Sequence, residues 1–419
     1  MRLGLDGLGA CVLSGGLALV ALAPTDAAHA KGFEVLYRFC SQQNCTDGLW
    51  PYAGLLADNQ GNLYGTTGAG GTSPCRLYGC GTVFKLTPDG TEAVLHAFTA
   101  SYDGSGPYGG LIADANANLY GTTATGGSTG CGGIDYGCGT VFKVATDGTE
   151  SVLYAFGGNS DGAYPLAAVV SDKAANLYGT TSDGGGGTQC IVQFGGCGTV
   201  FRISPKGKEK VLYAFTGGSD GANPQASLVI DKAGNLFGTA AYGGNTSACN
   251  QGLSPGCGTV FEVAADGTEK TLYTFQGGND GWAPVANLIE DKSGNLYGTT
   301  QAGGSTSACN GVGCGIVFRI APDGTETVLY SFTGGTDGAH PSAGVIADAK
   351  GDLYGTTEAG GVDDEGTVFK LTPREKLVVL SGFNGQGDAP VAPLIAGAKG
   401  YLYGTTEFGP SGTVFKVKK

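Results

Sequence analysis

The sequence predicts an all-β fold, a seven-bladed β-propeller with four strands in each blade. Three observations predict it: a long tandem repeat, four short apolar runs in each repeat, and one strand that is missing at the carboxyl end and present at the amino end. Tyr-Gly-Thr-Thr occurs six times, with a near copy at Phe237, and the copies lie 49 to 60 residues apart. The six copies begin at Tyr64, Tyr120, Tyr178, Tyr297, Tyr354 and Tyr403.

The unit from 227 to 275 shows how one blade is built. Its apolar runs are separated by turn signals at Gly234 and Gly267 and by a longer loop with two cysteines. Runs of this length between glycine-rich turns are typical of strands. The sequence therefore predicts strands at 227–231, 235–240, 258–263 and 270–275. Continuously apolar outer runs, such as 152–156, indicate sheets covered on both faces by neighbouring blades.

Counting the strands by type predicts how the ring closes. The first, second and third strand types occur seven times each, and the last third strand is 412–417. The fourth strand of that unit is absent, while 33–39 is a fourth strand with no unit before it. We expect 33–39 to pair with 412–417, because this pairing leaves no open sheet edge. A linear β-solenoid is the alternative, and it would leave both ends incomplete.

The amino terminus has the layout of a secretory signal peptide. Arg2 precedes an apolar stretch at 11–23, and Ala28-His29-Ala30 follows as a cleavage site. We expect residues 1–30 to be removed, leaving one domain at 31–419 that is secreted or periplasmic. The alternative is an uncleaved membrane anchor, which the short, interrupted stretch disfavours. No later segment predicts a membrane span.

Composition excludes some partners. The 419 residues include 80 glycines, and the formal net charge is −13. Aromatic residues recur beside the glycines at fixed offsets, which low-complexity disorder lacks. An acidic chain without a lysine- or arginine-rich run repels phosphate backbones, so nucleic acid is not an expected partner. We expect a monomer.

Twelve of the thirteen cysteines lie beyond the signal peptide, in pairs that are adjacent in sequence. Zinc would need four close ligands, whereas the pairs fall on separate repeats and only His96 and His340 remain in the mature chain. We therefore expect disulfides, no bound metal and an oxidising compartment. The pairs are Cys40 with Cys45, Cys75 with Cys80, Cys131 with Cys138, Cys190 with Cys197, Cys249 with Cys257, and Cys309 with Cys314.

The repeat also resembles a known family. Gly-Thr-Val-Phe, Asp-Gly-Thr-Glu, Val-Leu-Tyr-Ser-Phe, Asp-Gly, a proline and Gly-Asn-Leu-Tyr-Gly-Thr-Thr follow one another, and 317–357 carries nearly the whole pattern. This series is similar to the GloVer tandem repeat of exported bacterial proteins, over about residues 33 to 418. The resemblance implies a propeller-like extracellular protein and implies no particular reaction.

In a blade of this kind the cysteine loops share one face with the connections between blades. Those connections repeat Asp-Gly-x-x-Pro, where aspartate closes a tight turn and proline begins the next strand. We interpret the aspartates as structural, because a calcium loop would need more closely spaced oxygen ligands. They are Asp47, Asp103, Asp161, Asp220, Asp280 and Asp337. The acidic run Asp363-Asp364-Glu365 is interpreted as a solvated loop tip.

Residues that break the repeat on this face are the candidate ligand contacts. Aromatic side chains there can stack on sugar rings or anchor a protein partner, or they can pack under neighbouring loops. His340 is a candidate contact and alone makes a poor catalytic base. The candidates are Trp50, Tyr52, Tyr108, Tyr164, Trp282 and His340.

The sequence favours a non-catalytic binding module whose partner is an extracellular polysaccharide or a surface protein, held by the disulfide-stapled loop face. No catalytic residues and no cofactor are predicted, because no Ser, His and acid constellation or phosphate-binding loop is evident. An extracellular propeller enzyme of lactonase, lyase or glycosidase type is the alternative, with its site at the central channel. A structural envelope protein is a further alternative.

Overall fold

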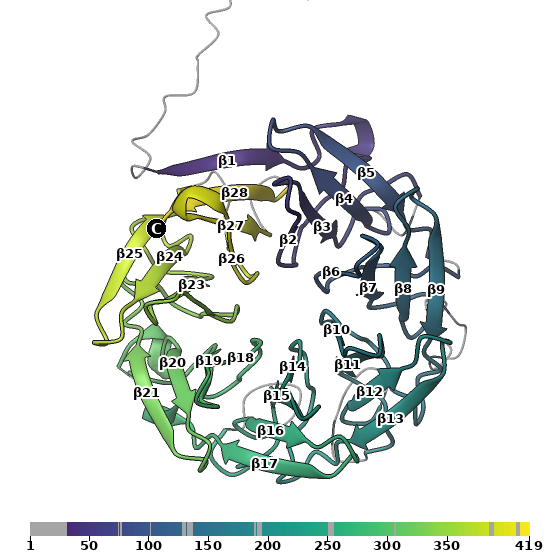
Figure 1. Ribbon diagram of the computed structural model, residues 1–419. Helices are drawn as coiled ribbons and strands as arrows, with labels where there is room; N and C mark the ends of the chain where they lie inside the picture. Colours follow the sequence, from purple (N-terminus) through teal and green to yellow (C-terminus); the bar gives the residue numbers. More distant parts are fainter. Residues whose placement is uncertain are drawn as a thin grey trace, which may run out of the picture.

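The computed structural model describes residues 32–73, 75, 78–100, 102–127, 131, 137–187, 190, 195–249, 255–305, 307–384, 389–407 and 411–419. Within these residues, 28 strands form seven four-stranded antiparallel sheets around a central axis (Figure 1). This arrangement confirms the predicted propeller. The predicted signal peptide, residues 1–30, lies outside the described residues. In the part of the chain that is described, no helix has the length and apolar character needed to cross a bilayer.

Each blade contributes one strand of each kind from the axis outward. The innermost strands are β2 (Leu56–Ala57), β6 (Ile112–Ala113), β10 (Val170–Ser171), β14 (Val229–Ile230), β18 (Ile289–Glu290), β22 (Ile346–Ala347) and β26 (Ile395–Ala396). The second strands are β3 (Leu63–Thr67), β7 (Leu119–Thr123), β11 (Leu177–Thr181), β15 (Leu236–Ala240), β19 (Leu296–Thr300), β23 (Leu353–Thr357) and β27 (Tyr401–Thr406).

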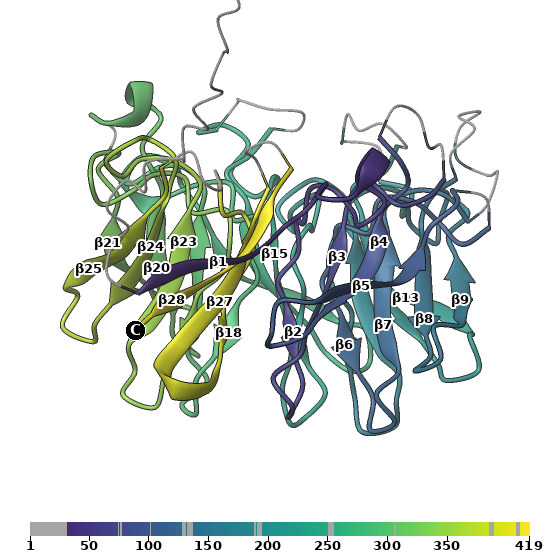
Figure 2. The same ribbon diagram turned by 90° about the horizontal axis from the view of Figure 1, so that it is seen from above.

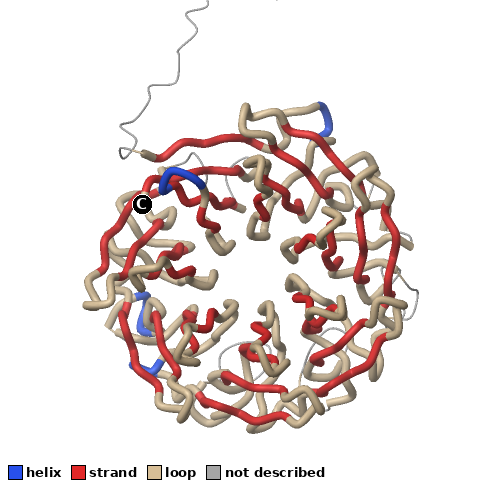
Figure 3. Tube along the Cα trace, viewed as in Figure 1, coloured by secondary structure: helices blue, strands red, loops and turns tan. Residues whose placement is uncertain are grey.

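The third strands are β4 (Thr82–Leu86), β8 (Thr140–Val144), β12 (Thr199–Ile203), β16 (Thr259–Val263), β20 (Ile316–Ile320), β24 (Thr367–Leu371) and β28 (Thr413–Lys418). The outer strands are β5 (Glu92–Ala97), β9 (Glu150–Ala155), β13 (Glu209–Ala214), β17 (Glu269–Thr274), β21 (Glu326–Ser331), β25 (Leu377–Gly382) and β1 (Phe33–Arg38). Single-turn 3-10 helices interrupt four loops (Figure 3): η1 (Gln43–Cys45), η2 (Gly278–Asp280), η3 (Cys309–Gly311) and η4 (Ala398–Gly400).

The ring closes as the strand count predicts. β1 pairs antiparallel with β28, so that Phe33 lies opposite Val417 and Arg38 lies opposite Thr413. The seventh blade therefore consists of β26, β27, β28 and β1, and it joins the two ends of the domain (Figure 1).

The Tyr-Gly-Thr-Thr repeat holds neighbouring blades together. In the first blade, the Thr66 hydroxyl donates to the carbonyl of Gly109 in the next blade, at 3.1 Å. All seven blades repeat this bond, and in the last of them Thr405 donates to Ala53 of the first blade at 2.9 Å. The second threonine, such as Thr67, instead bonds within its own blade to Thr82 of the third strand, at 2.8 Å.

The glycine of the repeat leaves room for a phenylalanine ring. A Cβ atom at Gly65 would lie 2.6 Å from the ring of Phe84, its partner on the neighbouring strand. The close approach that this glycine allows therefore lies within one blade. These rings also join the blades, because each outer strand is directly followed by a phenylalanine that meets the next blade's ring edge to face. Phe98 and Phe142, for example, have ring centroids 5.0 Å apart.

The innermost strands depart most from prediction in length, and the others agree to within a residue. The sequence predicts 227–231 as a strand, whereas β14 has two residues. The reason lies three residues before it, since the Ala226 carbonyl accepts a hydrogen bond from Thr180 of the preceding blade. The chain near the axis is therefore held partly by the neighbouring blade and not by its own sheet.

The two faces of the disc differ. The connections between blades and the loops between second and third strands lie together on one face, which we call the loop face (Figure 2). Backbone bridges such as Leu49 with Ala69 and Ala339 with Ala359 join the two kinds of loop. The opposite face, here called the turn face, carries the short hairpin turns.

Candidate functional site

A cavity of about 290 Å³ lies on the propeller axis and is lined by residues from all seven blades. Its wall consists mostly of small residues, such as Ala53, Gly54 and Ala167. The side chains that distinguish one blade from another follow the proline of each connection between blades. In blade order they are Tyr52, Tyr108, Leu166, Gln225, Val285, Ser342 and Val391. Because these connections belong to the loop face, the cavity forms the mouth of the central channel on that face.

Two tyrosines form one side of the channel mouth. The rings of Tyr52 and Tyr108 meet edge to face, with centroids 4.9 Å apart. Gly68 makes room for the pair, since a Cβ atom there would lie 2.6 Å from Tyr108 and 2.9 Å from Tyr52. Burial raises the pKa of Tyr52, and its hydrogen bond to Glu407 raises it further. The Tyr52 hydroxyl is therefore a neutral hydrogen-bonding group at physiological pH.

Two carboxylates from neighbouring blades lie behind Ser342 and Tyr52 of the mouth. Glu358 accepts hydrogen bonds from the Ser342 hydroxyl at 2.7 Å and from the Gln301 amide at 3.4 Å. Glu407 is 8% exposed and is hydrogen-bonded to Tyr52. Burial raises the pKa of Glu407 to about 7; the Tyr52 hydrogen bond lowers it, and the negative charge of Glu358 raises it. Each glutamate is therefore linked to the cavity by a hydrogen-bonded residue that lines it. This residue is Ser342 for Glu358 and Tyr52 for Glu407.

His340 is fixed by its loop. Its backbone has φ of 56°, its N–H donates to Cys314 at 2.8 Å, and its Nδ1 lies 3.0 Å from the carbonyl oxygen of Gln301. Asn223 has the corresponding place in another blade, where its amide donates to the Ser182 carbonyl at 2.8 Å. The histidine thus makes the same side-chain bond to the preceding blade as an asparagine does, and it does not line the cavity.

The remaining aromatic candidates lie outside the cavity lining. Trp50 is half-buried and contacts Tyr78, with ring centroids 5.1 Å apart, and Tyr78 is 56% exposed. The indole of Trp282 donates to the Val312 carbonyl at 3.4 Å and packs on the core between two blades. Tyr164 is half-buried against the core beside Tyr52, whose pKa it raises. For all three, a role in ligand contact stays a prediction.

The disulfides brace the loops that carry the mouth residues. All six predicted pairs are bonded: Cys40–Cys45, Cys75–Cys80, Cys131–Cys138, Cys190–Cys197, Cys249–Cys257 and Cys309–Cys314. In five blades the carbonyl of the second cysteine accepts a hydrogen bond from the residue before the proline, as Cys138 does from Tyr164 at 2.9 Å. The staple therefore fixes the backbone next to the residue that lines the channel.

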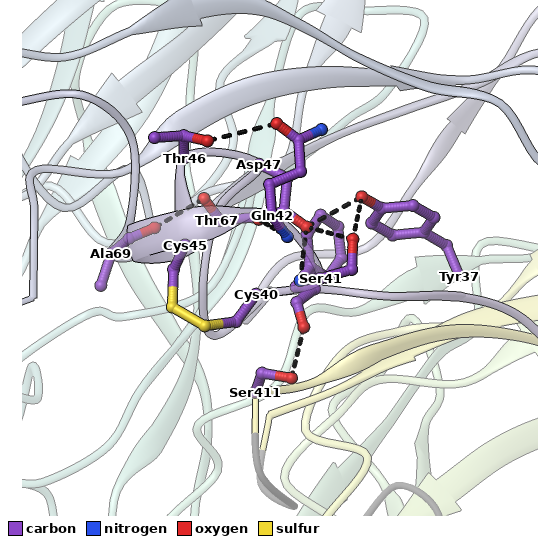
Figure 4. The surroundings of a disulfide bond; sticks show 11 residues. Tyr37, Cys40, Ser41, Gln42, Cys45, Thr46, Asp47, Thr67, Ala69 and Ser411 are labelled. Atoms are coloured by element: carbon purple, nitrogen blue, oxygen red, sulfur yellow. Dashed lines mark hydrogen bonds between the residues drawn. A yellow bond between two sulfur atoms is a disulfide. The ribbon is translucent and has the colours of Figure 1, made fainter.

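The repeated aspartates are used by their own loops. Asp47 accepts from the Tyr37 hydroxyl at 2.8 Å and from the Ser41 N–H at 2.9 Å, beside the first disulfide (Figure 4). Asp161, Asp220, Asp280 and Asp337 accept from the matching tyrosines, and Asp103 from His96. In the acidic run, Asp364 accepts from the Gly360 N–H at 2.8 Å. Among the described residues, no group of three or more potential ligands could hold a metal ion.

A second set of carboxylates lies on the outer rim, where blades meet. Glu92 begins β5, and one or both carboxylate oxygens of Glu92, Glu150, Glu209 and Glu326 are buried without a hydrogen-bond partner. Burial, and then the charge of the aspartate in the adjacent loop, raise the pKa of Glu92, Glu209 and Glu326 to about 7. For Glu150 the pKa is also about 7, since burial and Asp103 raise it while His96 lowers it.

Sequence reasoning missed Glu358 and Glu407. The innermost strands, where the catalytic carboxylates of an enzyme would be expected, hold mostly small apolar residues. The two glutamates instead directly follow the second strands β23 and β27. The detectable signal was the residue after each Tyr-Gly-Thr-Thr copy, which is small in most blades and acidic in two. In blade order this residue is Gly68, Ala124, Ser182, Ala241, Gln301, Glu358 and Glu407.

Comparison with families finds one match. The model of the Gloeobacter/Verrucomicrobia repeat matches residues 25–192, 129–252 and 246–419, which together span the whole propeller. Comparison with curated proteins finds no relative of similar sequence.

Solved propellers share the architecture at low identity. An oligogalacturonate lyase in complex with manganese has a TM-score of 0.53 and 11% identity, over 93% of this chain and 98% of its own. The oligogalacturonate lyase of Vibrio parahaemolyticus has a TM-score of 0.53 and 9% identity, over 92% and 96%. A gluconolactonase of Xanthomonas campestris has a TM-score of 0.40 and 15% identity, over 73% and 82%. For the two lyases the similarity extends to the fold alone.

Proposed function

The chain belongs to the Gloeobacter/Verrucomicrobia repeat family, and we propose that it is a secreted or periplasmic, non-catalytic protein that binds a polysaccharide at its channel mouth. The observation that carries this proposal is the cavity itself. The tyrosine pair Tyr52 and Tyr108 offers aromatic surface on one side, and Ser342, Gln225 and Asn287 offer hydrogen-bonding groups elsewhere on the wall. Aromatic surface combined with a few placed polar groups is what recognition of a sugar ring requires.

The disulfides support both the location and the mode of action. Six disulfides in one chain are typical of an oxidising compartment outside the cytosol. They also rigidify the loops that carry Tyr52, Tyr108 and their equivalents, so little conformational entropy is lost when a ligand binds.

A glycan array with the mature chain, followed by calorimetry on the ligands found, tests the proposal. We expect Tyr52→Ala and Tyr108→Ala each to weaken binding about tenfold or more, as loss of a stacking contact does. Tyr102→Ala is the matched control, because Tyr102 is 85% exposed on the same face and does not line the cavity. Loss of binding in Trp50→Ala or Trp282→Ala, with the tyrosine variants unchanged, would place the site elsewhere on the loop face.

A propeller enzyme of lactonase, lyase or glycosidase type is the second candidate, and one observation favours it. Glu407, with its pKa of about 7, lies in the electrostatic field of Glu358 from the preceding blade, and a pair of this kind can act as acid and base. Turnover of a bound glycan that is lost in Glu407→Gln, with binding retained, would support the enzyme. Absence of both binding and turnover would leave a structural envelope protein.

A further inference from the structure

The loop face is distinguished by its charge. Among its described residues none is lysine or arginine, and in the sequence of its segments Arg76 alone is basic. Every described lysine and arginine belongs to a strand, to a hairpin turn of the turn face, or to the carboxyl-terminal end. The described carboxylates of the loop face are Asp47, Asp103, Asp161, Asp183, Asp220, Asp280, Asp337, Glu358, Asp363, Asp364, Glu365 and Glu407.

Two of these carboxylates lie directly behind the cavity wall, each hydrogen-bonded to a residue that lines it. Glu358 is bonded to Ser342 and Glu407 to Tyr52, and both partners line the cavity. Their hydrogen bonds come from neutral groups, and among the described residues neither glutamate forms an ion pair. A concave site walled by small apolar residues strengthens the field of such charges, because the wall excludes water.

We propose that the ligand of the channel mouth is a polysaccharide that carries protonated amino groups, with its sugar rings on Tyr52 and Tyr108 and an ammonium group beside Ser342, in the electrostatic field of Glu358 and Glu407 behind the wall. This inference rests on the proposed function and specifies its ligand. An ammonium group supplies hydrogen-bond donors and the positive charge that the carboxylate pair lacks. A uronic-acid chain would place carboxylates against an acidic face, and like charges at close range cost several kcal/mol.

The alternative cationic ligand is a basic protein segment, and the structure favours the sugar. The cavity is about 290 Å³ in volume, which suits a few sugar rings better than a folded protein surface. The two tyrosine rings at its edge present ring faces and edges of the kind that pack on a pyranose.

Three hexasaccharides of different charge test the proposal at about pH 7, where Glu407 is partly ionised: glucosamine, N-acetylglucosamine and galacturonate. We expect the glucosamine chain to bind at least about tenfold more tightly than the acetylated chain, with an affinity that falls as salt is added. We expect no binding of the galacturonate chain. The double variant Glu358→Gln/Glu407→Gln is expected to lose the preference for glucosamine, so that its affinities for the glucosamine and acetylated chains lie within about twofold of each other.

Asp89→Asn serves as the matched control, because it removes one negative charge from an exposed turn on the turn face. Equal affinity for the glucosamine and acetylated chains, or a preference that survives in the double variant, would overturn the inference. If both chains bind equally and Tyr52→Ala abolishes binding, the proposed function stands and only the ligand class is wrong. If no glycan binds, both fail. Binding of polylysine that is unaffected by Tyr52→Ala would point to a basic protein and also overturn the inference.

Discussion

Raising the pH from about 5 to about 8 is expected to destabilise the propeller through the carboxylates on its rim. Glu92, Glu150, Glu209 and Glu326 lie between blades, and each has its pKa raised from an ordinary 4.5 to about 7. The folded state therefore holds protons that the unfolded chain has released in this range. The contribution of these four glutamates to the free energy of unfolding is complete below about pH 4.5 and is lost as the pH rises through 7.

The size of the effect follows from the shift and from the exposure. A shift from 4.5 to about 7 corresponds to about 3 kcal/mol for a fully buried carboxyl group. The rim glutamates are only half-buried, so solvent screening reduces this to about 1 kcal/mol each. Four of them give about 4 kcal/mol, which corresponds to roughly 5 °C in the melting temperature of a domain of this size.

Thermal unfolding followed by circular dichroism across this pH range measures the effect. The control is a variant in which all four rim glutamates are replaced by glutamine, because glutamine resembles a protonated glutamate and does not titrate. We expect the variant to lose most of the decline in melting temperature between about pH 5 and pH 8. A wild-type melting temperature that is constant or rises with pH, or a variant that declines as steeply as the wild type, would refute the reasoning.

Two further predictions concern packing. Gly68→Ala places a methyl group 2.6 Å from the Tyr108 ring. We therefore expect a loss of about 1 to 3 kcal/mol in the free energy of unfolding, measured with urea. Unchanged urea unfolding would show that the tyrosine pair can move freely. Phe39→Ala removes the ring that meets Phe84 across the closure, at 4.9 Å, and Phe98→Ala removes the equivalent ring, 5.0 Å from Phe142, inside the disc. A closed ring predicts that each costs about 3 to 5 kcal/mol in urea unfolding, and a much smaller cost for Phe39→Ala would contradict closure.

The sequence was sufficient for the architecture because each blade repeats its own constraints. The second threonine, the glycine beneath the phenylalanine ring and the paired cysteines recur at fixed offsets, so their contacts are local and repeat from blade to blade. Closure of the ring was equally predictable, since the strand at 33–39 has no preceding unit to pair with. The bond from Thr405 to Ala53 shows that the last junction resembles the six others.

The candidate site was only partly predictable, for a physical reason. Tyr52 and Tyr108 were recognised as aromatic residues that break the repeat, yet nothing in the sequence says that their rings meet at the axis. Glu358 and Glu407 belong to a different part of the blade, and their neighbours come from other blades. Convergence at the axis depends on the ring geometry, which relates residues that are far apart in the chain and have no shared motif.

The hydrogen bond from the residue before each proline to the preceding loop has a consequence for how this surface can change. It holds the main chain in the same left-handed conformation at Trp50, Tyr164, Asn223, Ala283, His340 and Ala389, whatever the side chain is. The residue after the proline therefore occupies an equivalent position at the channel mouth in every blade, whatever its side chain is. Single substitutions after the proline in separate blades can therefore change the ligand specificity of the channel mouth, while the backbone that holds these residues stays the same.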